Sequence, residues 1–116
     1  MTAKKLCGAT HLLVTPSGEP TGMVDRVLAE QGLTRRIGLT VNQFVLAPRI
    51  VASSNLVAVL AERAVTLSGV AKALHVAAVP LALPDVRIQM LWHRRTNRDP
   101  ALSWLRSRIA ELCRAL

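Results

Sequence analysis

The stretch VNQFVLAPRIVASSNLVAVLAERA, residues 41–64, contains the succession of elements that decides the fold class. It continues a short run at residues 37–41 that predicts a strand, and apolar residues at helical spacing then run through residues 44–52. A proline inside that second run predicts that the helix begins near it or bends there. The continuous apolar run at residues 56–60 has the character of a buried parallel strand. Residues 62–74 then predict a marginal helix, so strands and helices alternate as in an α/β fold.

The residues before this stretch extend the same alternation. A short apolar run at residues 11–14 predicts a strand, and it stops at TPSGEPTG, residues 15–22, whose prolines and glycines predict a loop. Thr21 offers an N-cap side chain to the next helix, and Asp25 near its start favours the positive end of the helix dipole. Gly32 stands where a left-handed residue ends that helix. The sheet predicted from this order is mainly parallel.

The residues after the stretch predict two further strands and a closing helix. The first strand spans residues 76–83 and is interrupted by a proline, and the second spans residues 86–92, where apolar and polar residues alternate. Asp99 and Pro100 then form an N-cap and first-turn pair. The final helix carries an apolar stripe with helical spacing: Leu105, Ile109, Leu112 and Leu116.

Two of these segments carry specific patterns. AP-x-IVA-x-S-x-L occupies residues 47–56, and WH-x-R-x-x-x-DPA-x-x-WLR occupies residues 92–106. In this order they resemble the closing half of the effector-binding domain of LysR-type transcriptional regulators, especially the branch that senses aromatic or related small organic acids. The resemblance implies a type II periplasmic-binding-protein-like α/β domain of two lobes. One departure is Leu60-Ala61, where family members often have Leu-Pro.

The resemblance also implies a division of the chain. Residues 9–79 look like the complete second lobe, residues 80–116 like the returning strand and closing helix of the first lobe, and residues 1–8 like an N-terminal extension. The family's winged helix-turn-helix, linker helix and opening strands have no counterpart, so no DNA-binding domain is expected in this chain. The expectation is a truncated regulator that meets DNA only through that missing element. Its uncovered lobe edge predicts dimerisation, unusual packing of the last helix, or aggregation.

The resemblance places the effector in the cleft between lobes, held by loops at strand ends and by helix N-termini. Two places in this chain match, and they supply six candidate effector-binding residues: Thr15, Ser17, Gly18, Asn42, Gln43 and Phe44. An amide pair beside a phenyl ring suits a small aromatic acid. The alternatives are that Asn42 caps the following helix with Phe44 as its first core residue, and that Ser17 and Gly18 form an ordinary turn.

Composition narrows the class of partner. Apolar residues make up 51% of the 116 residues, and 15 Lys and Arg against 7 Asp and Glu give a net charge of +8. This charge fits a small anionic effector or non-specific nucleic-acid binding, although the basic residues are dispersed and no aromatic residues are interleaved with them. The longest apolar tract, residues 73–83, is too short to span a bilayer, and no signal peptide precedes it. A cytoplasmic protein is expected, in which Cys7 and Cys113 are reduced thiols or form one closing disulfide.

No constellation of residues points to catalysis. The three histidines are far apart in sequence, and Cys7 with His11 makes a poor metal site without a second pair. No nucleophile elbow and no Gly-rich phosphate loop follows a strand. We therefore expect no enzyme, metal or cofactor. The alternatives to an effector-sensing fragment are a small basic nucleic-acid-binding protein and an interaction fragment that forms mixed oligomers with intact regulators.

Overall fold

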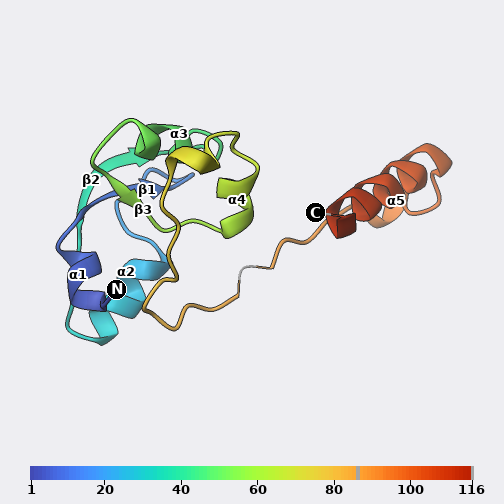
Figure 1. Ribbon diagram of the computed structural model, residues 1–116. Helices are drawn as coiled ribbons and strands as arrows, with labels where there is room; N and C mark the ends of the chain where they lie inside the picture. The colour runs from blue at the N-terminus through green and yellow to red at the C-terminus, as the bar shows by residue number, and fades with distance from the viewer. Residues whose placement is uncertain (86, 116) are drawn as a thin grey trace. The chain divides into compact units, whose positions relative to one another are not determined.

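The computed structural model describes residues 1–85 and 87–115, which fall into two compact units, Met1–Pro84 and Asp85–Leu116 (Figure 1). The first unit contains a parallel sheet and the buried core. The second contains one long helix, and none of its described residues is buried. The division after Pro84 follows compactness, and the lobe assignment of residues 9–79 and 80–116 stays a prediction.

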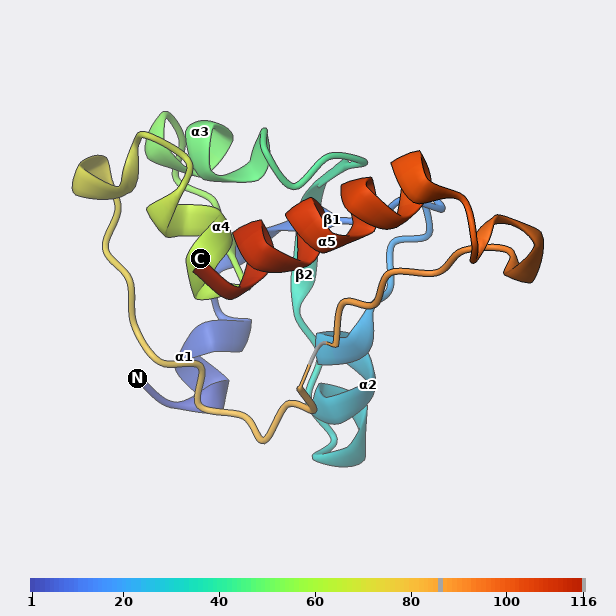
Figure 2. The same cartoon turned by 90° about the vertical axis from the view of Figure 1, so that its right-hand side faces the viewer.

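The sheet of the first unit has three strands within the described residues: β1 (Thr10–Val14), β2 (Arg36–Val41) and β3 (Val57–Ala58). Their order is β2-β1-β3, and β1 is parallel to both neighbours. Figure 2 shows β1 and β2 side by side. The predicted parallel α/β fold is therefore confirmed, with strands at residues 11–14 and 37–41 where the sequence placed them. The third strand is shorter than the predicted residues 56–60.

Short helices precede, connect and follow the strands: α1 (Ala3–Cys7), α2 (Met23–Glu30), α3 (Ala47–Ala52), α4 (Glu62–Thr66) and the 3-10 helix η1 (Ala71–Ala73). Helix α1 was not predicted, and Thr2 caps it by accepting a hydrogen bond from the Lys5 amide at 3.3 Å. Helix α3 has a proline in its first turn, as its sequence predicted, and packs against β1 and β3. The small core contains Leu6, Leu12, Val24, Leu28 and Ala47.

Helix α2 has its N-cap one residue after the predicted position and ends as predicted. Gly22, and not Thr21, is the N-cap residue, because the Asp25 carboxylate accepts a hydrogen bond from the Gly22 amide at 2.7 Å. At the other end Gly32 has a φ of +67°, and the Leu33 amide bonds the Leu28 carbonyl at 2.9 Å. This is the left-handed helix end predicted for Gly32.

Three predicted elements after residue 60 are wrong. The helix predicted over residues 62–74 is split into α4 and η1, and Gly69 between them has a φ of +76°, which a continuing helix excludes. No strand forms among the described residues of 76–83 or 87–92. The proline in the first range donates no amide to a ladder, and strand-like alternation forms no strand without a neighbouring strand to pair with. Val86, which began the second range, lies outside the described residues.

A glycine in β2 permits β2 to lie close to Thr10 of β1. His11 pairs with Ile37 and Leu12 pairs with Leu39, so Gly38 is the extra residue of a bulge. A Cβ at this position would overlap the methyl group of Thr10. Any larger residue would require the Thr10 side chain or one of the two strands to move.

The second unit consists of the 3-10 helix η2 (Arg94–Thr96) and helix α5 (Pro100–Ala115). Asp99 caps α5 by accepting a hydrogen bond from the Leu102 amide at 2.9 Å, which confirms the predicted N-cap. The guanidinium of Arg106 lies 4.8 Å from the centre of the Trp92 ring. Within the described residues, no helix has the length and apolar character needed to cross a membrane.

Candidate ligand-binding site

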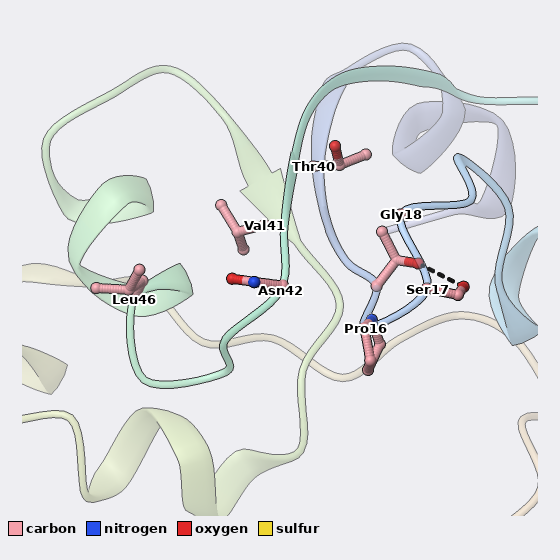
Figure 3. A pocket seen from close by; sticks show the side chains of 8 residues that line it. Pro16, Ser17, Gly18, Thr40, Val41, Asn42 and Leu46 are labelled. Carbon is pink, nitrogen blue, oxygen red and sulfur yellow. Dashed lines mark hydrogen bonds between the residues drawn. The ribbon is translucent and has the colours of Figure 1, made fainter.

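A hollow of about 480 Å³ lies at the carboxyl ends of β1 and β2 in the first unit (Figure 3). Parallel strands end at the same edge of a sheet, so the loops that follow them converge there. The hollow is lined by residues of these two loops and of the end of β2: Thr15, Pro16, Ser17, Gly18, Thr40, Val41, Asn42 and Leu46. In Figure 3 the residues of β2 lie between Leu46 on one side and Pro16, Ser17 and Gly18 on the other.

The first loop is tied to the sheet at its start. The amide of Thr15 donates to the Val41 carbonyl at 2.8 Å. The Thr15 side chain is buried, and its hydroxyl lies 3.3 Å from the Ser17 hydroxyl. The Gly18 amide donates to the Thr15 carbonyl at 3.3 Å, and Gly18 has a φ of +78°. Ser17 and Gly18 therefore lie in a turn that begins at Thr15, as the alternative for Ser17 and Gly18 predicted, and this turn lines the hollow.

The second loop brings one of its three predicted residues to the hollow. Asn42 lines it, whereas Gln43 and Phe44 do not. Asn42 does not cap the next helix, because α3 begins after its N-cap Leu46. Phe44 is not a core residue either, since 54% of its surface is exposed. The next two residues in sequence, Val45 and Leu46, are exposed as well.

The sequence did not single out Pro16, Thr40, Val41 or Leu46 as lining residues. Thr40 and Val41 end β2, so their place at this edge could have been inferred from the predicted strand. Leu46 offered no such signal, because the path of the turn at residues 43–46 depends on where α3 packs.

A buried polar network lies at the other end of β1. Arg35 donates to Asp25 from two nitrogens, Nε to Oδ1 at 2.8 Å and Nη2 to Oδ2 at 2.9 Å. Its third nitrogen, Nη1, lies 3.3 Å from His11 Nδ1, and His11 Nε2 lies 2.8 Å from the Leu6 carbonyl. These contacts fit a neutral imidazole that donates from Nε2 and accepts at Nδ1.

The network shifts two protonation equilibria. The hydrogen bonds from Arg35 hold the pKa of Asp25 below its usual value, against the opposing effect of burial. Burial lowers the pKa of His11, and the Arg35 charge lowers it further, although the Leu6 carbonyl and the Asp25 charge oppose this. This network was not among the features predicted from the sequence. Arg35 is 24 residues from His11, and no local pattern connects them.

A second hollow of about 480 Å³ in the first unit has a mostly apolar lining, drawn from α3, the end of β3, α4 and residues 74–79. Glu62 and His75 are its ionisable lining residues. Across the described ranges 1–85 and 87–115, no group of three His, Cys, Asp or Glu side chains is arranged to hold a metal ion. Both cysteines carry free thiols.

Comparison with known proteins gives one consistent family. Residues 1–114 match the family described as LysR substrate binding domain. The HTH-type transcriptional activator NagR of Ralstonia sp is 33% identical over 112 residues, which are 97% of this chain and 37% of that protein. The HTH-type transcriptional activator NahR of Pseudomonas putida is 30% identical over 116 residues, again 97% and 37% of the two chains. The chain thus spans little more than a third of the length of these curated relatives.

Two solved structures agree with this match. The regulatory domain of MexT, a transcriptional activator in Pseudomonas aeruginosa, superimposes with a TM-score of 0.75 at 30% identity, over 96% of this chain and 56% of that one. The probable transcriptional regulator PA0477 of the same organism gives a TM-score of 0.65 at 25% identity, over 72% and 28%.

Proposed function

The chain belongs to the LysR substrate-binding domain family, and on that premise we propose that it senses a small organic acid for a transcriptional regulator. The proposed ligand is an aromatic or related carboxylate bound in the hollow at the ends of β1 and β2. In the parent protein this binding would change the arrangement of the lobes and, through it, the regulator's engagement with DNA. Such a change requires different affinities of the ligand for the two arrangements.

The composition of the hollow is the observation that carries this proposal. Ser17 and Asn42 supply hydroxyl and amide donors, and no acidic side chain is among the lining residues. Pro16, Val41 and Leu46 supply apolar surface beside them. A few polar groups in a partly apolar hollow are typical of small-molecule sites, and the net charge of +8 favours an anion over a cation.

The roles of Gln43 and Phe44 belong to the same proposal. Both residues are exposed, and Phe44 follows the lining residue Asn42 by two positions. Phe44 lies in sequence between the lining residues Asn42 and Leu46, and its exposed ring is proposed to pack on an aromatic ligand, with the Gln43 amide donating to the ligand carboxylate. If residues 9–79 form one lobe, this edge of the hollow would face the other lobe.

Nuclear magnetic resonance titration of the full chain with benzoate tests the proposal. We expect saturable shifts of the Ser17, Gly18 and Asn42 amides with benzoate, and much weaker shifts with benzyl alcohol at the same ionic strength. Asn42→Ala should weaken binding by roughly tenfold, the effect of losing one hydrogen bond to a charged group. Ser107→Ala, an exposed change in α5, is the matched control. Equal responses to benzoate and benzyl alcohol, or shifts spread evenly over the chain, would reject the site.

A further inference from the structure

The loop that lines the hollow, residues 15–22, is fixed at its far end by a buried ion pair. The following inference rests on the proposed function, because it concerns the same hollow. We propose that Arg35, which does not line the hollow, positions this ligand loop through Asp25 and Gly22. Arg35 is thus a positioning residue for the ligand and not a ligand contact.

The connection from Arg35 to the loop is continuous. Arg35 Nη2 donates to Asp25 Oδ2 at 2.9 Å, and the same oxygen accepts the Gly22 amide at 2.7 Å. Arg35 Nε holds the other carboxylate oxygen at 2.8 Å, so the carboxylate cannot rotate without losing a charge-assisted bond. The Gly22 carbonyl is also held by the first turn of α2, since it accepts from the Asp25 amide at 3.1 Å and from the Arg26 amide at 3.3 Å. The guanidinium adds to this by fixing the carboxylate that accepts from the Gly22 amide.

The ligand loop has few other attachments. Its start is held by the Thr15 amide on the Val41 carbonyl and by the turn to Gly18. Among the described residues, the amides of Glu19 and Thr21 donate no hydrogen bond, and Pro20 has no amide hydrogen to donate. The loop is consequently hydrogen-bonded at its two ends, and we expect a displacement of Gly22 to reach Gly18 and Ser17 through the three residues between them.

Burial distinguishes this ion pair from an ordinary surface pair. The side chain of Arg35 is 1% exposed and that of Asp25 is 20% exposed. Arg35 is further oriented by His11, whose Nδ1 lies 3.3 Å from Nη1, and His11 sits in β1, the central strand. The end of the loop at Gly22 is thereby connected, through Asp25, Arg35 and His11, to β1, the strand whose carboxyl end borders the hollow. A positioning residue requires such a connection to a rigid element.

The test uses two conservative variants of the full chain. Arg35→Lys keeps the charge but cannot hold both carboxylate oxygens in the same fork, and Asp25→Asn keeps one oxygen acceptor but loses the ion pair. Val24→Ala is the matched control, because it removes core volume from the same helix without touching the ion pair. Three quantities are measured: hydrogen exchange of the Gly22 amide, amide shifts of Ser17 and Gly18, and the Kd for benzoate.

We expect both variants to accelerate Gly22 exchange by roughly tenfold relative to global exchange, and to move the Ser17 and Gly18 resonances. The Kd for benzoate should rise by roughly fivefold to tenfold. Val24→Ala should lower the melting temperature but leave these loop readouts and the Kd of the folded protein within about twofold.

Loop resonances and a Kd that match the Val24→Ala control would overturn the proposal and leave Arg35 a purely stabilising residue. If the wild-type chain does not bind benzoate, the proposed function fails for this ligand. Gly22 exchange and the Ser17 and Gly18 resonances then still decide whether Arg35 positions the loop. If Arg35→Lys does not fold, Asp25→Asn decides the matter by the same readouts.

Discussion

The two units of this chain form secondary structure for different reasons. The first, Met1–Pro84, builds its strands by pairing residues that are far apart in sequence, and it buries a core around Leu12 and Leu28. The second, Asp85–Leu116, builds α5 from capping and helical propensity within the helix itself, and no described side chain of α5 is buried. The difference shows that a clear local signal predicts an element without predicting what packs against it.

The apolar stripe of α5 is exposed, unlike the apolar core of the first unit. Leu105 is 46% exposed, Ile109 is 40% exposed and Leu112 is 67% exposed. An amphipathic stripe normally faces a core, and a single helix of this length is marginal in water. Stability measurements can therefore ask, unit by unit, whether each apolar side chain contributes to folding.

The largest effect is expected from paired leucine truncations. Leu28→Ala removes a fully buried side chain and should lower the free energy of unfolding by about 2–5 kcal/mol. Leu105→Ala removes an exposed one and should change it by no more than about 0.5 kcal/mol. Urea titrations followed by circular dichroism measure both. A cost for Leu105→Ala close to that for Leu28→Ala would mean that α5 is covered in solution, and sedimentation would then show whether a second copy covers it.

The next largest loss of stability is expected when one of two glycines, Gly38 in the sheet, is replaced by alanine. Gly38→Ala places a Cβ against the Thr10 methyl in the sheet and should destabilise the chain by about 1–3 kcal/mol. Gly8→Ala is the control, because Gly8 has a φ of −70° and a Cβ there would lie at an ordinary contact distance of 3.5 Å from the Lys5 carbonyl oxygen. The control should be neutral or slightly stabilising. Equal melting temperatures for the two variants would show that the bulge tolerates a side chain.

Lowering the pH should reduce the stability of the first unit through protonation of His11. Because burial lowers the pKa of His11 below 6.5, the unfolded chain binds a proton more readily than the folded one. The free energy of unfolding should therefore fall as pH falls from about 6.5 toward the lower folded pKa, and His11→Gln should flatten that part of the profile. Asp25 acts in a separate window, since its lowered pKa stabilises the fold above about 3.8 and that contribution is lost at lower pH. An unchanged slope in His11→Gln would contradict the assignment.

The smallest effect is expected from the cap of α5. Asp99→Ala removes the acceptor for the Leu102 amide and should weaken the first turn by about 1 kcal/mol. The amide chemical shifts of the first unit should be the same in the variant as in the wild type, because the cap stabilises only α5. Asp99→Asn, which keeps the acceptor, is the control. Widespread resonance changes in the first unit would instead show that the two units depend on each other.

These contrasts explain which parts of the fold the sequence could predict. The helix end at Gly32, the cap at Asp99 and the strands at residues 11–14 and 37–41 rest on short-range patterns, and they were confirmed. The type II periplasmic-binding-protein-like α/β fold agrees with the solved relatives. The strands predicted at residues 76–83 and 86–92 were wrong in their described parts, because a strand exists only with a partner and alternation of side chains does not supply one.

The candidate site was predictable to a similar extent. Its position at the carboxyl ends of two strands follows from a parallel α/β topology, and Thr15, Ser17, Gly18 and Asn42 line the hollow there. Their role in binding remains a prediction, as do the roles of Gln43 and Phe44. Arg35 could not have been found, because its contacts depend on tertiary pairing between β1, α2 and the residues that precede β2.

The central position of β1 also has a consequence for how the chain is made. β1 leaves the ribosome before either neighbour, and its residue Thr10 must wait for Arg36, while His11 must wait for Val57. At synthesis rates of about 5–20 residues per second, the apolar β1 stays without its first partner for roughly one to five seconds. During translation β1 is therefore open to chaperones and to misassociation until β2 has been synthesised and can pair with it.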